Sequence, residues 1–284
     1  MPELPEVETV ANGIKQNILG KKISLIETSN KRLRLPFPDN LLDLEGSVVE
    51  SVERRARYIF IKISDYILLV HLGMSGKLLF NQQLPEIRAK HDHFFMGFAD
   101  GSGLVYNDPR RFGLVDLVKE NEILQHSMIK NLGPEPLSDA FNVAYLGEQL
   151  KGKNMNIKTI MMDNVIVVGV GNIYINEALF ESKISPLKPA KDLSKKELEL
   201  LVKNIKAILA NAIEKGGSTL RDYVQLNGDV GAFQFEHKVY GREGEACVVC
   251  SKSHEFLRCA QDDNKIKRIK QNGRSTFYCV KCQK

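Results

Sequence analysis

The sequence predicts a multidomain α+β protein, and three observations support this fold class. Short apolar runs separated by turn residues fill the stretch from about Lys22 to Lys119, a pattern typical of a β-sandwich or barrel. Beyond residue 138 the apolar residues recur at helical spacing. Two Cys-x-x-Cys pairs lie within the last 38 residues, and such pairs are typical of a small structural zinc domain.

The composition is that of a globular chain. Of the 284 residues, 43% are hydrophobic, which is enough for the cores of two domains. No apolar run approaches the ~20 residues that a membrane span needs, and the N-terminus lacks the basic and apolar regions of a signal peptide. We therefore expect a soluble, cytoplasmic protein.

Positive charge is concentrated at the C-terminus. The chain carries a net charge of +5, but residues 247–284 alone hold nine Lys/Arg against three Asp/Glu. A cationic tip on a nearly neutral body favours contact with a polyanion, and a solubilising tail is the alternative. All five cysteines lie in this same tip, which argues against the distributed disulfides of a secreted fold.

The N-terminus places a potential nucleophile beside an acid. Removal of Met1, which the small Pro2 should permit, leaves a secondary amine next to Glu3. An α-amino group titrates near ~8, so a useful fraction is unprotonated at neutral pH. Such an amine can attack a sugar carbon, and Glu3 can protonate the sugar oxygen as the ring opens. The alternative is an ordinary solvated terminus that precedes a helix.

Local patterns predict the elements of the first half. Apolar residues at helical spacing predict a helix over residues 5–20 that ends at Gly20. This helix would hold the terminal amine in place. Asp100-Gly101 is a hairpin signal between two strands. The predicted strands are Ser47–Val52, Tyr58–Ile63, Ile67–Leu72, Lys77–Phe80, His93–Phe98, Gly103–Tyr106 and Gly113–Val118.

The second half is predicted to be helical after a linker at residues 131–136. Ser138 or Asp139 can cap a helix that runs towards Leu150, and a second helix is expected over Asn156–Asp163. A capping box at Ser194–Glu197 opens a long helix that ends at Gly216-Gly217.

The run Gly169–Tyr174 resembles half of a dinucleotide-binding fingerprint. Tyr174 occupies the position of the third glycine, and no βαβ unit surrounds the run, so we reject a dinucleotide cofactor. We expect a tight turn instead, with Asn172 at the start of a helix whose N-terminus can bind phosphate.

The cysteine spacing predicts one tetrahedral zinc site, with Cys247, Cys250, Cys279 and Cys282 as ligands. The 28 residues between the pairs exceed the usual gap of roughly 15 to 20. An excursion of 12 residues over Ser253–Asn264 would leave an ordinary gap of 16. Cys259 falls within this excursion, and we expect a spare thiol there.

A cluster of cations also lies between the two cysteine pairs. A zinc-held hairpin that presents such cations can lie on DNA phosphates. The cluster consists of Lys265, Lys267, Arg268, Lys270 and Arg274.

Several motifs, in order along nearly the whole chain, resemble those of bacterial formamidopyrimidine-DNA glycosylases. This family excises 8-oxoguanine from DNA. The matching stretches are Pro2–Thr9, His71–Gly76, Lys90–His93, Asn107–Gly113, Gly169–Tyr174, Val239–Arg242 and the two cysteine pairs.

The resemblance implies an architecture and an activity. The architecture would be an N-terminal β-sandwich over residues 1–130, a linker over 131–137, a helix-two-turn-helix domain over 138–236 and a zinc finger over 237–284. Duplex DNA would bind in the cleft between the domains. The activity would be removal of 8-oxoguanine and formamidopyrimidines, followed by β,δ-elimination at the abasic site. One structural Zn²⁺, no organic cofactor and a monomeric state are expected.

The resemblance also implies residue roles. Pro2 would form a Schiff base with the deoxyribose, with Glu3 as the acid. The side chains that enter the duplex where the damaged nucleotide is flipped out would be Met74, Arg110 and Phe112. His71, His91, Lys153, Asn172 and Arg274 would contact DNA, and Arg274 would also serve the second elimination. The loop Gln225–Phe235 would cover the flipped purine.

One position departs from the family pattern. Arg57 stands in Arg54-Arg55-Ala56-Arg57-Tyr58 where the family has a lysine assigned to proton donation or lesion contact. A guanidinium keeps the charge but stays protonated, so a phosphate contact is expected to survive while proton transfer is in doubt.

Two alternatives stay open. An endonuclease VIII type enzyme for oxidised pyrimidines typically has Gly at the position of Leu4 and lacks the Met/Arg/Phe set. A non-catalytic zinc-containing DNA-binding protein would not need Pro2 and Glu3.

Overall fold

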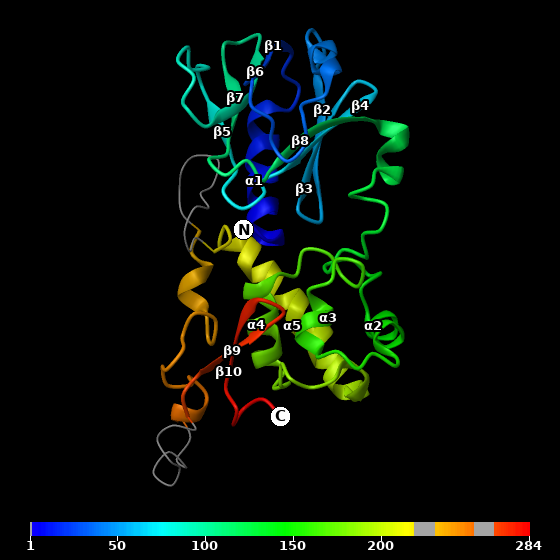
Figure 1. Cartoon of the computed structure of the whole chain (residues 1–284), viewed down its shortest axis with the longest axis vertical. Helices are drawn as coiled ribbons and strands as arrows, with labels where there is room; N and C mark the ends of the chain where they lie inside the picture. Colours follow the sequence, from blue (N-terminus) through cyan, green and yellow to red (C-terminus); the bar gives the residue numbers. More distant parts are fainter. Residues whose placement is uncertain (1, 219–230, 253–263) are drawn as a thin grey trace. The chain divides into compact units, whose positions relative to one another are not determined.

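The computed structural model describes residues 2–218, 231–252 and 264–284. Spatial proximity of backbone positions divides the chain into two compact units. The N-unit consists of Met1–Lys130 and Ile213–Gln234, and the C-unit consists of Asn131–Ala212 and Phe235–Lys284. Figure 1 shows the sheets of the N-unit in blue to green and the helices of the C-unit in green to yellow.

The N-unit is a β-sandwich of two antiparallel sheets, as predicted. The first sheet has the order β1 (Ile23–Thr28), β6 (Asp92–Phe98), β7 (Gly103–Asn107), β5 (Lys77–Asn81). The second sheet has the order β2 (Val49–Arg55), β3 (Tyr58–Ile63), β4 (Tyr66–His71), β8 (Leu114–Lys119). Buried residues of both sheets form one hydrophobic core. The expected β6–β7 hairpin is present, with Gly101 at φ 84°.

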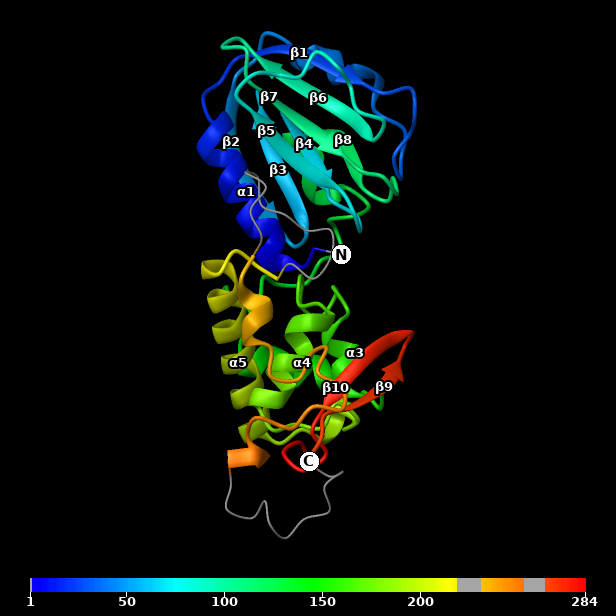
Figure 2. The same ribbon diagram turned by 90° about the vertical axis from the view of Figure 1, so that its left-hand side faces the viewer.

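Helix α1 (Leu4–Ile18) packs along this sandwich and contacts β2, β3 and β5, which belong to both sheets. Its buried face carries the apolar residues that recur at helical spacing, namely Val7, Val10, Ala11, Ile14 and Ile18. Gly20 follows the helix at φ 76°, a conformation that glycine adopts without strain. Figure 2 shows α1 in dark blue along the side of the strands. Two short 3₁₀ helices, η1 (Asp39–Leu44) and η2 (Glu120–Gln125), complete the N-unit before residue 130.

The helices of the second half are α2 (Val143–Leu150), α3 (Ile157–Met161), α4 (Asn172–Glu181) and α5 (Lys195–Glu214). The capping box that opens α5 is present, because the Ser194 N–H donates to Oε2 of Glu197 at 2.8 Å and the Glu197 N–H donates to the Ser194 hydroxyl oxygen at 3.3 Å. Gly216 and Gly217 end this helix at φ 70° and 79°. Short 3₁₀ turns lie at η3 (Ala190–Asp192), η4 (Phe233–Glu236) and η5 (Cys250–Lys252).

The predicted cap of α2 was wrong. Asn142 is the N-cap, and its side chain accepts the Tyr145 N–H at 2.9 Å. The Ser138 hydroxyl instead donates to the Glu135 carbonyl at 2.8 Å, so a local turn precedes the helix and delays its start. The second expected helix, over Asn156–Asp163, is shorter in the structure. Helix α3 spans Ile157–Met161, and its N-cap Asn156 accepts the Thr159 N–H at 2.9 Å.

The C-terminal segment forms a hairpin of β9 (Lys267–Gln271) and β10 (Arg274–Tyr278). Asn272 and Gly273 form its turn with φ of 46° and 74°, as a tight right-twisted hairpin requires. Phe180 of α4 joins a small core with Val239, Ile266, Phe277 and three of the cysteines. Among the described residues, no helix is both long and apolar enough to cross a membrane.

Candidate functional site

The N-terminal residues of the described chain are fixed inside the N-unit. Pro2 is buried, and Glu3, the N-cap of α1, is 5% exposed. The backbone N–H of Glu3 donates to Oε2 of Glu6 at 2.8 Å. Pro5 near the helix start has no N–H to lose and a φ suited to a helix. The terminus therefore has the fixed position that a nucleophilic amine needs.

Glu6 connects this terminus to a distant segment of the same unit. It is 2% exposed, and its other oxygen, Oε1, accepts the Ser218 N–H at 2.8 Å. Gly217 allows the close approach, since a Cβ there would lie 2.8 Å from Oε1 of Glu6. In the sequence, Glu6 stands out only as part of the N-terminal motif. Its position three residues after the N-cap Glu3 is the signal that could have marked it.

A second group forms at the β2–β3 turn. Ala56 and Arg57 make the turn, with Ala56 at φ 55°. Tyr58 pairs with His71 across β3 and β4, and their ring centroids lie 4.9 Å apart. Arg57 precedes Tyr58 in the chain, and its positive charge is near enough to lower the pKa of His71.

His71 is a neutral imidazole at ordinary pH. Its Nδ1 accepts the Gly73 N–H at 3.0 Å, so the ring proton resides on Nε2. Burial, and then the positive charges of Arg57 and Arg34, lower the pKa of His71 from 6.5 to about 4. The ring can therefore act as a neutral N–H donor to an anion.

Met74, Arg110 and Phe112 come together from two loops of the N-unit. Met74 lies between β4 and β5 and is 40% exposed, while Phe112 lies between β7 and β8 and is 49% exposed. The Arg110 guanidinium lies 4.8 Å from the centroid of the Phe112 ring. A Cβ at Gly73 would lie 2.5 Å from the Gly113 nitrogen, so the loops touch directly. The two touching loops thus present two exposed apolar side chains and one stacked cation.

His91 precedes β6 and is half-buried. Its carbonyl accepts the N–H of Asp108 at 2.9 Å, which places it beside the loop of Arg110. Asp108 was not among the predicted site residues, and it is 0% exposed. An aspartate that precedes a proline at the end of a strand is a turn signal, but nothing local predicts that its carboxylate is buried.

Three predicted DNA-contacting residues lie in the C-unit. A cavity of about 630 Å³ lies between α3 and the β9–β10 turn, and both Lys153 and Arg274 line it. Both side chains are exposed. The buried Lys158 and the turn residue Asn272 also line the cavity. The arrangement presents cations around a hollow that could hold an anionic group.

Asn172 connects the start of α4 to the hairpin. Its side chain is 8% exposed, and Nδ2 donates to the Ser275 carbonyl at 3.0 Å. Nζ of Lys158 donates to the same carbonyl at 3.1 Å and to Thr276 Oγ1 at 2.8 Å. Asn176 Oδ1 accepts the Phe277 N–H at 2.7 Å. These bonds set the position of Arg274 at the start of β10. No sequence motif had marked Lys158 or Asn176 as functional.

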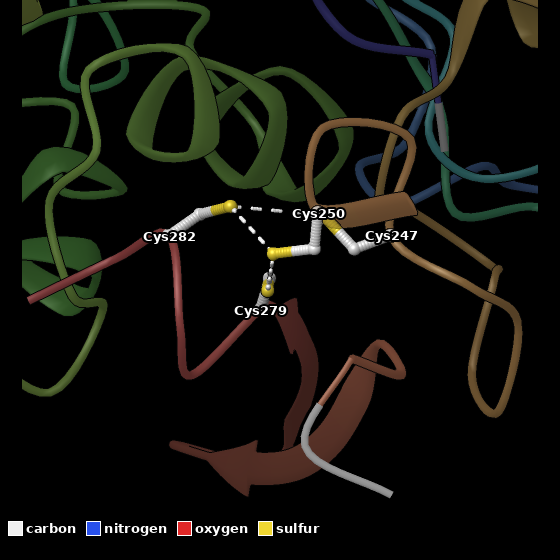
Figure 3. Close-up of side chains that lie close together, drawn as sticks. All are labelled: Cys247, Cys250, Cys279 and Cys282. Atoms are coloured by element: carbon white, nitrogen blue, oxygen red, sulfur yellow. Dashed lines mark hydrogen bonds between the residues drawn. The ribbon is translucent and has the colours of Figure 1, made fainter. Parts of the chain in front are cut away.

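Four cysteines converge at one point of the C-unit, as Figure 3 shows. Cys247, Cys250 and Cys279 are buried, Cys282 is half-buried, and all four sulfurs lie within 4.8 Å of one another. Three Sγ–Sγ distances are 3.7, 3.7 and 3.2 Å. Thiolates about 2.3 Å from a tetrahedral zinc ion would lie about 3.8 Å apart. The cluster could therefore bind one metal ion.

Parts of the predicted site lie outside the described residues. These parts are Met1, residues 225–230 of the loop expected to cover the purine, Cys259 and residues 253–263 of the excursion.

The whole chain is similar to known proteins. Residues 1–115 match the formamidopyrimidine-DNA glycosylase N-terminal domain, and residues 132–224 match the H2TH domain of the same enzymes. A formamidopyrimidine-DNA glycosylase of Cronobacter sakazakii is 46% identical over 286 residues, which cover 100% of both chains.

Solved structures are also similar to the whole chain. A Lactococcus lactis Fpg variant in complex with Fapy-dG containing DNA is 36% identical, with a TM-score of 0.87 and 100% of both chains covered. A MutM protein in complex with DNA containing carbocyclic 8-oxo-G is also 36% identical, with a TM-score of 0.86 over 100% of both chains. On the evidence of its two matched domains and its full-length relatives, this chain belongs to the formamidopyrimidine-DNA glycosylase family.

Proposed function

We propose that this protein is a base-excision repair enzyme that removes 8-oxoguanine and formamidopyrimidines from duplex DNA and then cleaves the abasic site. The full-length similarity to enzymes of this type, some solved with Fapy-dG or 8-oxo-G DNA, carries the proposal. The buried Pro2-Glu3 pair supports catalysis over binding alone, because a DNA-binding protein needs no fixed amine and acid.

Pro2 is the proposed nucleophile once Met1 is removed. Its amine attacks C1′ of the deoxyribose, the N-glycosidic bond breaks and the base leaves with the bonding electrons and takes up a proton. Glu3 protonates the ring oxygen as the sugar opens, and the resulting iminium acts as an electron sink. Loss of the C2′ proton then expels the 3′ phosphate, and loss of the C4′ proton in a second elimination expels the 5′ phosphate.

Met74, Arg110 and Phe112 are the proposed side chains that fill the duplex where the nucleotide has left. Extruding a base costs a few kcal/mol of stacking, and apolar or planar groups inserted in its place restore part of it. The exposure of Met74 and Phe112 and the stacking of Arg110 on Phe112 support this role.

The proposed backbone contacts come from both units. The N-unit contributes His71 as a neutral N–H donor, together with His91 and the positively charged Arg57. The C-unit contributes Lys153, Asn172 and Arg274. Arg57 provides charge rather than a proton, since a guanidinium does not deprotonate at physiological pH. We assign any role in the second elimination to Arg274.

Zinc is the proposed metal at Cys247, Cys250, Cys279 and Cys282. Four sulfur ligands suit a structural Zn²⁺, which would hold the segment that carries the hairpin. Cys259 would lie outside the metal shell, because a four-coordinate site has no position for a fifth thiolate. We further propose that the protein acts as a monomer with chromosomal DNA in the cytoplasm.

The test is cleavage of duplexes that each carry one lesion, with borohydride present to trap an imine. Cleavage and trapping with 8-oxoguanine, and little with thymine glycol, are expected. The reverse preference would indicate an endonuclease VIII type enzyme. Tight binding to both duplexes without cleavage of either would indicate a non-catalytic DNA-binding protein.

A further inference from the structure

Asp108 is a fully buried carboxylate that the proposed chemistry does not use. It is 0% exposed and follows β7. Its Oδ1 accepts the Ser75 hydroxyl at 2.7 Å and the Arg110 N–H at 3.2 Å. Its Oδ2 accepts the Gly113 N–H at 2.9 Å. A buried carboxylate requires such donors, and here they come from both loops that carry Met74, Arg110 and Phe112.

The backbone of Asp108 is held equally firmly. Its N–H donates to the His91 carbonyl at 2.9 Å, and its carbonyl accepts the Arg111 N–H at 3.2 Å. The same carbonyl lies 3.2 Å from Nε2 of the buried His93, and a carbonyl can only accept, so Nε2 donates the proton. Arg111 adopts φ 55°, a conformation that a non-glycine residue keeps only where its surroundings impose it.

The two loops pack so closely at their base that no side chain larger than glycine fits at Gly76 or Gly113. A Cβ at Gly113 would lie 1.6 Å from the Tyr106 hydroxyl, and a Cβ at Gly76 would lie 2.4 Å from the same atom. This hydroxyl donates to the His71 carbonyl at 3.1 Å. The ring of Tyr106 is fully buried. The base of both loops is therefore closely packed, whereas Met74 and Phe112 on the same loops are exposed.

Three of the donors to the carboxylate belong to, or directly follow, a void-filling residue. Ser75 follows Met74, the Arg110 N–H belongs to a void-filling residue itself, and Gly113 follows Phe112. We propose that Asp108 is a positioning residue that joins the two loops into one rigid wedge, so that Met74, Arg110 and Phe112 enter the duplex together. This inference rests on the proposed function, and it adds a residue that touches neither DNA nor the reacting atoms.

A rigid wedge matters because of conformational entropy. Three side chains that moved independently would each have to be ordered when the nucleotide leaves the stack, whereas a preformed group is ordered when the protein folds. Asp108 therefore acts on extrusion and not on the N-terminal chemistry.

The variant Asp108→Asn tests this role. Asparagine has nearly the same size and keeps one oxygen, but its amide group turns an N–H towards one of the present donors. We expect single-turnover excision of 8-oxoguanine from a duplex to fall on the order of a hundredfold, as for a misplacement of about 1 Å. The Kd for the duplex should change far less, because the phosphate contacts stay in place.

Two further variants serve as a partial-loss variant and as a control. Ser75→Ala removes one donor and leaves the two backbone donors, so it should give a smaller loss of the same kind in a folded protein. Asp116→Asn is the matched control in β8, where the carboxylate accepts the Leu117 N–H at 2.9 Å and lies 3.2 Å from His126 Nε2. It should excise at the rate of the unmodified protein.

The readout that separates positioning from folding is borohydride trapping on a single-stranded abasic oligonucleotide, where no duplex has to be filled. Trapping by Asp108→Asn at the unmodified rate, together with slow duplex excision, is the expected pattern. Duplex excision by Asp108→Asn equal to that of Asp116→Asn would overturn the inference, as would a parallel loss of trapping on the single strand. Failure of the unmodified protein to excise 8-oxoguanine would instead refute the proposed function.

Discussion

Glu6 offers the most direct structural perturbation of the N-terminal site. The change Glu6→Gln preserves the size of the side chain but replaces one oxygen with an amide nitrogen. That nitrogen must face either the Glu3 N–H or the Ser218 N–H, each of which now donates to the carboxylate at 2.8 Å. The substitution therefore removes one hydrogen bond and places two donors against each other.

The expected energy follows from the burial of the pair. Glu6 is 2% exposed, and a hydrogen bond to a charged group contributes roughly 1.5–3 kcal/mol. We expect the free energy of unfolding to fall by about that amount, measured from the midpoint of urea denaturation. If the lost bond is the one to Glu3, a shift of the terminus by about 1 Å should lower single-turnover excision on the order of a hundredfold.

Glu53→Gln is the matched control, because Glu53 is exposed in β2. It should unfold and excise like the unmodified protein, since surface substitutions usually change stability by less than about 0.5 kcal/mol. The reasoning would be refuted if Glu6→Gln behaved as this control does in both measurements.

Three further predictions concern other parts of the site. Arg57→Ala should weaken DNA binding and flatten its salt dependence, while Arg57→Lys should bind nearly normally. Faster strand cleavage by Arg57→Lys at unchanged excision would mean that a proton-transfer role was lost with the arginine. Equal rates of strand cleavage in Arg57→Lys and the unmodified protein would mean that the lysine's assigned chemistry is unimportant here. Metal analysis should find one zinc ion per chain in Cys259→Ser, whereas Cys279→Ser should lose both the zinc and DNA binding. Release of zinc by Cys259→Ser would contradict the four-cysteine site. The pKa of His71 is about 4 in the folded protein against a reference value of 6.5, so the unfolded state takes up a proton first as the pH falls. The free energy of unfolding should therefore decrease by up to about 3 kcal/mol as the pH drops from about 6.5 to 4. His71→Asn should reduce this pH dependence in denaturation curves, and an unchanged pH dependence would count against the buried neutral ring.

The sequence predicted those features that depend on neighbours along the chain. The strands from β2 to β8 follow apolar runs, the capping box at Ser194 is a local pattern, and the glycines that end α1 and α5 occur where positive φ is needed. The cysteine cluster was predictable because metal-ligand spacing is a property of the sequence. The cap of α2 was missed because Ser138, Asp139 and Asn142 are all good caps and only the turn at Glu135 decides between them.

The contacts that position the site could not be predicted in this way. Asp108 reaches Ser75 from 33 residues away, and Glu6 reaches Ser218 from 212 residues away. Lys158 is 1% exposed and donates to the Ser275 carbonyl on the hairpin, although a lysine on a short helix would ordinarily be assigned to the surface. The burial of each polar group depends on tertiary partners that no local pattern shows. The division into domains at residues 131–137 and 237 stays a prediction.

The central claim is that the terminal amine of Pro2 forms the covalent intermediate. The most direct measurement is digestion of the borohydride-trapped complex with 8-oxoguanine DNA, followed by mass spectrometry of the peptide that carries the sugar. The modification should lie on the N-terminal peptide at Pro2, and protein that retains Met1 or an N-terminal tag should form no complex. A sugar attached to a lysine, or undiminished trapping by the tagged protein, would contradict the claim.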